Sequence, residues 1–259
     1  MRQLLDATPS WLLIIICFAI FAAICTISRW LVRRRTSDER REEVADYASS
    51  LVSGLAATFA FLVGFAITMT WGAVNAGQDA VDSLAASSQQ LSWSSSNIAD
   101  QAGAAEIKSR LTAYLNAFVT DDAEALAQGN VSPLPTAVPF DKLQDAVHSV
   151  AYRGGDSIPE ASGMVNAAAA LTAAQSKVTA VAQRSLPPLL IVLILLAGAL
   201  LAVGMGTAAA TVERPTLMYG WAFLSGLSLT MVLMLDYPFG GAISVNLAPV
   251  AQVAQAVAG

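Results

Sequence analysis

The stretch "LPPLLIVLILLAGALLAVGMGTAAATV", residues 186–212, decides the fold class. It contains no charged residue, and it is longer than the ~20 apolar residues that a helix needs to cross a bilayer. The whole chain agrees with this stretch, since 55% of its 259 residues are hydrophobic and only 13% are charged. Because soluble domains carry about 25% charged residues, the sequence predicts an integral membrane protein.

Three further apolar segments are predicted to cross the membrane, namely residues 11–32, 51–74 and 216–236, so that residues 1–10 form an N-terminal tail. The first segment contains Trp11 and Trp30 near its ends, and tryptophan is typical of membrane interfaces. We do not expect it to be a cleaved signal peptide, because its apolar core is long and three arginines follow it directly.

The arginines predict the orientation in the membrane. Residues 29–41 hold six of them, and Arg214 lies in the short loop between the last two spans. Short loops rich in lysine and arginine stay in the cytoplasm. The sequence therefore predicts a multi-pass protein of the plasma (inner) membrane, with an Arg-rich cytoplasmic loop at residues 33–50. Both termini and residues 75–185 are predicted to lie outside the cytoplasm.

Residues 75–185 are predicted to form an all-helical extramembrane region. Apolar residues recur at helical spacing, with two serines in the first stripe. These residues are Val81, Leu84, Leu91 and Ile98, interrupted by Ser88 and Ser95, then Ile107, Leu111, Tyr114, Leu115 and Phe118, then Leu143 and Val147. The alanine-rich residues 166–186 favour helix and lead into the span at 186–212. The predicted fold is all-α, with four transmembrane helices and a helical hairpin built on extensions of the second and third.

Asp236 ends the fourth span. A carboxylate deep in hydrocarbon costs about 2.5 to 3.5 kcal/mol, so we expect Asp236 at the interface with a hydrogen-bonding partner. That partner is either a backbone N–H group of the following turn or Arg184, which precedes the third span. A solvated aspartate at a helix end is the alternative.

Residues 237–259 are predicted to be a C-terminal turn and tail. Pro238 cannot continue the helical hydrogen bonding, and Gly240 and Gly241 allow backbone angles that other residues avoid. These residues, together with Asp236, are expected to form a sharp structural turn. The turn would fold the tail back along the membrane surface or against a neighbouring helix.

No pattern in the sequence predicts catalysis. The chain has no phosphate-binding glycine loop, no G-x-S-x-G and no H-E-x-x-H, and its single histidine, His148, is expected on a helix surface. The basic residues 29–41 are interleaved with acids, unlike a nucleic-acid footprint. We therefore expect no enzyme activity, no catalytic residue, no cofactor, no metal and no nucleic-acid partner.

Two groups of residues have simple structural interpretations. Cys17 and Cys25 both lie in the first span, about 12 Å apart along a helix, and are expected to be apolar filling. Asp121, Asp122 and Glu124 are expected to form a solvated helix end.

The second span, residues 51–74, has two different faces. At 100° per residue, one face is small, hydroxylated and aromatic, and its residues are Gly54, Thr58, Phe61, Phe65, Thr68 and Gly72. The opposite face is aliphatic.

Two interpretations of that face are open. Glycines at positions 54, 64 and 72 (Gly54, Gly64 and Gly72) can let helices pack closely. Alternatively, Thr58, Phe61, Phe65 and Thr68 can line a pore, in which the phenylalanines form a hydrophobic constriction and the threonines wet the wall. Spacing alone favours helix packing.

Five segments resemble the bestrophin-like family of bacterial multi-pass membrane proteins. They are "ATFAFLVGFAITMTW", "AVDSLAASSQQL", "IKSRLTAYLNAFV", "QRSLPPLL" and "LDYPFGGAISVNLAPV". The resemblance covers about residues 51–250, and "LDYPFGG" is its most specific part. The family usually has a Glu-Ala pair after the second span, whereas residues 82–85 of this chain contain no glutamate.

The resemblance implies a function and an orientation. Bestrophins proper are pentameric anion channels with an apolar constriction on their second membrane helix, which implies that residues 51–74 line a central pore. Bestrophins keep their large helical region in the cytoplasm, opposite to the orientation that the arginines predict. We keep the orientation from the arginines, since it comes from this chain.

Two hypotheses of function follow. The first is a homo-oligomeric channel for small inorganic ions, expected to be anions, with a pore lined by the second span. The second is a non-conducting envelope protein that docks a protein partner or a larger assembly through residues 75–185.

Overall fold

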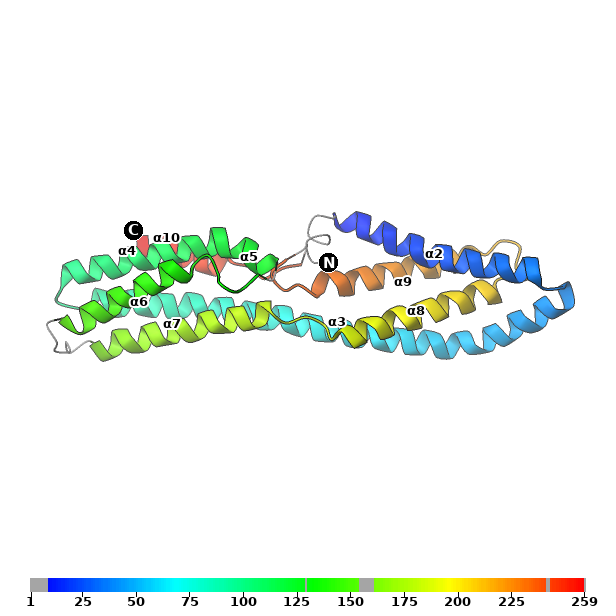
Figure 1. Cartoon of the computed structure of the whole chain (residues 1–259), viewed down its shortest axis with the longest axis horizontal. Helices are drawn as coiled ribbons and strands as arrows, with labels where there is room; N and C mark the ends of the chain where they lie inside the picture. The colour runs from blue at the N-terminus through cyan, green and yellow to red at the C-terminus, as the bar shows by residue number, and fades with distance from the viewer. Residues whose placement is uncertain (1–8, 129, 154–160, 241–242, 259) are drawn as a thin grey trace. The chain divides into compact units, whose positions relative to one another are not determined.

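The computed structural model describes residues 9–128, 130–153, 161–240 and 243–258. Every regular element in these ranges is a helix (Figure 1). Four helices are long and apolar enough to cross a membrane, and they are α2 (Ser10–Arg35), α3 (Asp38–Ser96), α8 (Pro188–Ala208) and α9 (Thr216–Leu235). The all-α prediction with four transmembrane helices is confirmed.

The chain divides into two compact units. The membrane unit takes its described residues from Ala7–Trp71 and Ser185–Asp236, and the extramembrane unit takes most of its residues from Gly72–Arg184 and Tyr237–Gly259. Helix α3 contributes to both, because its 59 residues continue well past the predicted end of the second span at residue 74.

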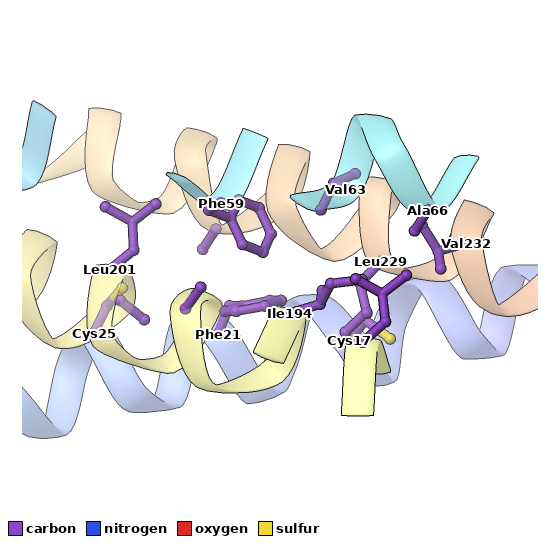
Figure 2. Close-up of a cluster of buried hydrophobic side chains, with 14 of the residues drawn as sticks. Cys17, Phe21, Cys25, Phe59, Val63, Ala66, Ile194, Leu201, Leu229 and Val232 are labelled. Carbon is purple, nitrogen blue, oxygen red and sulfur yellow. The ribbon is translucent and has the colours of Figure 1, made fainter. Parts of the chain in front are cut away.

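In the membrane unit, α2 packs against α8 and α9. The core is apolar, and Figure 2 shows Phe21 of α2 and Phe59 of α3 within it. The rings of these two residues lie 6.2 Å apart, and the Phe21 and Trp221 rings lie 5.9 Å apart, both edge to face. Cys17 and Cys25 are buried free thiols in the same core, as expected for apolar filling.

Three glycines allow the membrane helices to approach closely. A Cβ atom added at Gly206 of α8 would overlap the backbone carbonyl of Cys25. One added at Gly226 of α9 would lie 2.7 Å from the backbone nitrogen of Phe18, and one at Gly198 would lie 2.9 Å from the Phe21 ring. Backbone contact of this kind is typical of helices in a bilayer.

The Arg-rich segment 33–50 is mostly helical, because α2 continues to Arg35 and α3 begins at Asp38. Arg33 of this segment and Arg29, which precedes it, bind carbonyls just after the end of α8. Arg29 donates to the carbonyls of Ala209 and Val212 at 3.0 and 2.5 Å. Arg33 donates to those of Ala210 and Val212 at 2.7 and 2.9 Å. These carbonyls belong to residues that follow α8, so the two guanidinium groups tie α2 to the segment that leaves α8.

The extramembrane unit buries the predicted apolar stripes. Its helices besides α3 are α4 (Gln101–Ala117), the π-helix η1 (Phe118–Asp122), α5 (Ala123–Ala127), α6 (Ala137–Ala151), α7 (Ala161–Ala182) and α10 (Ala248–Ala258). Val81, Leu84 and Leu91 of α3 are fully buried. Ser88 and Ser95 in the same stripe are also buried, and their hydroxyls donate to carbonyls of α3 itself.

Two elements differ from the predicted layout. The alanine-rich helix α7 ends at Ala182 and α8 begins at Pro188, so the chain leaves the helical conformation before it enters the third span. The tail contains helix α10, which packs against α4 and was not predicted.

Candidate functional site

The face of α3 that carries the candidate pore residues points away from the core of the membrane unit. The opposite face is buried through Phe59, Val63 and Ala66. Phe61 and Phe65, by contrast, are 70% and 49% exposed. Their rings are nearly parallel, with an interplanar angle of 9° and centroids 6.4 Å apart. Within the chain, α3 therefore presents a pair of stacked aromatic rings to its surroundings.

Two threonines accompany these rings on the same face. Thr58 and Thr68 are exposed, and their hydroxyls donate to the carbonyls of Gly54 and Gly64 at 3.0 and 2.9 Å. Each hydroxyl proton is thus satisfied inside the helix. The hydroxyl oxygens keep lone pairs, so they can still accept hydrogen bonds from water or from another donor.

The three glycines of the predicted second span make no close contact within the chain. A Cβ atom added at Gly54, Gly64 or Gly72 would meet no atom within 4 Å. Small residues on a membrane helix usually allow another helix to approach. Their role in helix packing therefore stays a prediction.

The exposed face has a polar counterpart in the extramembrane stretch of α3. At the same helical spacing, Asn75, Asp79, Asp82 and Ala86 are exposed. Sequence reasoning missed Asp79 and Asp82, because the apolar stripe on the other side of this stretch dominated the pattern. The sequence pattern that could have identified them is the spacing of three and four residues, which continues along the same helix face after Thr68.

Asp236 forms a buried hydrogen bond at the end of α9. The residue is only 6% exposed, and its Oδ1 accepts the backbone N–H of Leu186 at 2.6 Å. Leu186 precedes the first residue of α8, so its N–H group has no acceptor within that helix. The sequence had offered the following turn or Arg184 as donors, and it did not predict Leu186. This contact ties the end of the fourth span to the start of the third.

The turn after Asp236 belongs to the extramembrane unit. Gly240 donates its N–H to the carbonyl of Tyr237 at 3.1 Å, and Val245 donates to that of Pro238 at 2.8 Å. A Cβ atom added at Gly77 of α3 would lie 2.6 Å from the Val245 side chain, so α3 is closely covered here. Gly241, which the sequence assigned to the turn, lies outside the described residues.

A buried polar cluster in the extramembrane unit was not predicted. Asp122, expected to be solvated, is fully buried at the end of η1. Its Oδ1 accepts the backbone N–H of Thr136 at 3.0 Å, and its Oδ2 accepts the Thr136 hydroxyl. Burial raises the pKa of the Asp122 carboxyl, while the Thr136 bonds act in the opposite direction. Burial, together with the charge of Asp122, also raises the pKa of Tyr114.

The described ranges contain no group of three histidine, cysteine or acidic side chains that could hold a metal ion. His148 packs its ring 4.9 Å from that of Tyr152. Both line a groove of about 630 Å³ between α6 and α7, together with Gln144, Ala168 and Thr172.

Four spanning helices, an exposed aromatic face on α3 and a helical extramembrane unit define a multi-pass membrane protein. The model of the bestrophin-like domain matches residues 19–250. The chain therefore belongs to the bestrophin-like family, which confirms the resemblance seen in the sequence.

Solved structures agree with this assignment. The chain is similar to a mutant of a bacterial bestrophin homologue from Klebsiella pneumoniae, with 15% identity and a TM-score of 0.70, covering 94% of this chain and 97% of that one. It is also similar to the homologue from the same organism solved by zinc phasing, with 16% identity and a TM-score of 0.68 over the same shares. At this identity the likeness shows the fold alone. No curated protein matches the chain.

Proposed function

We propose that the protein is a homo-oligomeric channel for small inorganic ions, with a pore lined by Thr58, Phe61, Phe65 and Thr68 of α3. The observation that carries this proposal is the exposure of a face that contains glycine, threonine and stacked phenylalanine. A face that only met lipid would need neither hydroxyls nor glycines. Copies arranged around an axis would bring these side chains together.

The chemistry of the face suits a hydrophobic gate. The Phe61 and Phe65 rings would narrow the pore and favour its dewetting, while the threonine oxygens would hold water on either side of them. This stretch of α3 carries no charge, so it would restrict ions by size and hydration. Anions are the expected ions, because the bestrophins that this family resembles are anion channels.

Alanine at positions 61 and 65 tests the gate. We expect Phe61→Ala with Phe65→Ala to raise single-channel conductance of the purified protein in planar bilayers by about twofold or more, because a wider pore wets more easily. The reversal potential in a potassium chloride gradient gives the sign of the permeant ion.

The matched control truncates two exposed apolar side chains on other spans. Leu196→Ala with Leu224→Ala, at residues 53% and 61% exposed on α8 and α9, should leave conductance unchanged. If wild type and the phenylalanine variant are both silent while the oligomer is present, the protein is not a channel.

We further propose the orientation that the arginines predict, in the plasma (inner) membrane. A cysteine at Ser96, which is exposed at the end of α3, should react with an impermeant thiol reagent in intact cells. A cysteine at Ser37, between α2 and α3, should react only after lysis. The native Cys17 and Cys25 are buried and give little background. The reverse pattern would show that the extramembrane unit lies in the cytoplasm.

A further inference from the structure

A charged hollow lies between α3 and α7 in the extramembrane unit. It has a volume of about 250 Å³, and its charged and hydroxyl-bearing lining residues are Asp79 and Ser83 of α3, Lys177 of α7, and Arg184, which follows the end of α7. Lys177 and Arg184 are exposed. Neither base pairs with Asp79, since the ion pairs among the described residues lie elsewhere. The hollow therefore holds two positive charges and one negative charge, with room for a further acid.

The hollow lies to one side of the exposed face of α3. Around the axis of α3, Ser83 lies about 40° from Asp79 and Ala80 lies about 100° from it in the same sense. Both residues line the hollow.

The other side of this face is closed by the chain itself. Gln78, about 100° from Asp79 in the opposite sense, donates to the carbonyl of Asn246 at 3.4 Å and accepts its N–H at 2.9 Å. Asp82, about 60° to that side, is exposed and accepts a hydrogen bond from Gln78 at 3.1 Å. No base in the described chain forms an ion pair with Asp82.

We propose that the hollow is the docking site for a second copy of this chain, whose Asp82 pairs with Lys177 and Arg184. This inference rests on the proposed function, in which copies form a ring with the exposed face of α3 toward the axis. In such a ring the two sides of that face meet different neighbours, so the contact is heterologous and closes by rotation. One side presents an acid and the other presents two bases, which is the complementarity that such a contact requires.

The charge count supports this occupant. With Asp82 from the neighbour, the two bases of the hollow face two acids, Asp79 from their own chain and Asp82 from the next. The alanines at 76, 80 and 180 of the same lining are small, so they allow a neighbouring helix to come close enough for the pair to form.

Charge reversal and rescue test the contact. Lys177→Glu with Arg184→Glu should weaken self-association in mild detergent about tenfold or more, as measured by native mass spectrometry, because like charges would then face each other. Asp82→Lys alone should do the same. The triple variant again places a base opposite two acids and should recover part of the wild-type self-association, because the unchanged Asp79 then lies beside those two acids.

Two controls separate this effect from misfolding. Arg110→Glu with Lys142→Glu reverses two bases outside the hollow and should leave the oligomer intact. As a second measurement, the double variant Asp82→Cys with Lys177→Cys should form a ladder of disulfide-linked copies after oxidation. Asp82→Cys with Lys142→Cys should give none.

The outcomes distinguish this inference from the proposed function. If the reversed variants keep both the oligomer and its conductance, and the first cysteine pair gives no ladder, the inference is overturned and the channel stands. If the wild-type protein is monomeric and silent, both are overturned. Dissociation by each reversal, followed by rescue in the triple variant, supports the second copy as the occupant.

Discussion

In the membrane unit α2 meets α8 and α9 backbone to backbone at glycines, whereas the closely covered glycines among the described residues of the extramembrane unit, Gly77 and Gly103, meet side chains. Gly206 and Gly226 place backbone against backbone. The interior of the extramembrane unit contains instead fully buried Tyr114, Phe118 and Leu111. The same chain therefore packs its helices in two ways along its length.

The difference follows from the solvent of each unit. Lipid tails are as apolar as leucine, so burial gives little drive for helices to associate within a bilayer, and close contact must do so. In water the removal of apolar surface drives packing directly. The positions of the polar contacts also differ between the units. Arg29 and Arg33 bind carbonyls just after the end of a membrane helix, whereas Asp122 binds Thr136 in the interior of the extramembrane unit.

The largest effect is expected from adding one methyl group to the membrane unit. Gly206→Ala would force its Cβ against the carbonyl of Cys25, and overpacking of this kind costs about 3 kcal/mol. We expect a much lower yield of folded protein and a lower Tm in detergent. Gly220→Ala is the control, because a Cβ there meets no atom within 4 Å. Equal melting of the two variants would show that α2 and α8 do not depend on this contact.

A smaller effect is expected at the end of the membrane unit. Asp236→Ala removes the acceptor of the Leu186 N–H, and a hydrogen bond to a charged group contributes about 2 kcal/mol. Asp236→Asn keeps an oxygen acceptor and should cost about half as much. Thermal melting in detergent measures both variants. An unchanged Tm in the alanine variant would contradict a structural role for this carboxylate.

The elements that apolar periodicity defines were predictable from the sequence. Four spans stand out because each is long and nearly free of charge, and the stripe through Val81, Leu84 and Leu91 is buried as its spacing indicates. The short helix α10 was missed because its alanine-rich sequence carries a weak signal without the α4 surface on which it packs.

Contacts between distant residues were not predictable. Glycine composition alone does not say which glycines meet another helix, and the structure gives that role within the chain to Gly206 and Gly226 rather than to Gly54. The burial of Asp122 depends on Thr136, which an irregular segment brings back beside the π-helix. The candidate face of α3 could be recognised in the sequence. Its exposure could not, because that depends on which face of the helix packs against the core.

The smallest effect concerns the pH dependence of the extramembrane unit. Burial, with a contribution from the nearby Asp121, raises the pKa of the Asp122 carboxyl, and the two hydrogen bonds from Thr136 oppose the rise. The folded protein therefore binds this proton more tightly than the unfolded chain does. As pH rises from the usual aspartate pKa through the raised pKa, the contribution of Asp122 to stability falls, and it stays lower above that range.

Asp122→Asn separates the charge from the shape. The amide oxygen can still accept the Thr136 N–H and the amide nitrogen can donate to the Thr136 hydroxyl, so at low pH the free energy of unfolding should change by less than about 1 kcal/mol. Because asparagine has no proton to lose, the variant should gain stability relative to wild type as pH rises through that window. Denaturant unfolding over a pH series measures the difference, and Asp145→Asn, at an exposed position of α6, is the control. Parallel profiles for wild type and Asp122→Asn would show that the buried carboxyl titrates like a solvated one, and the contrast between the two units would then rest on packing alone.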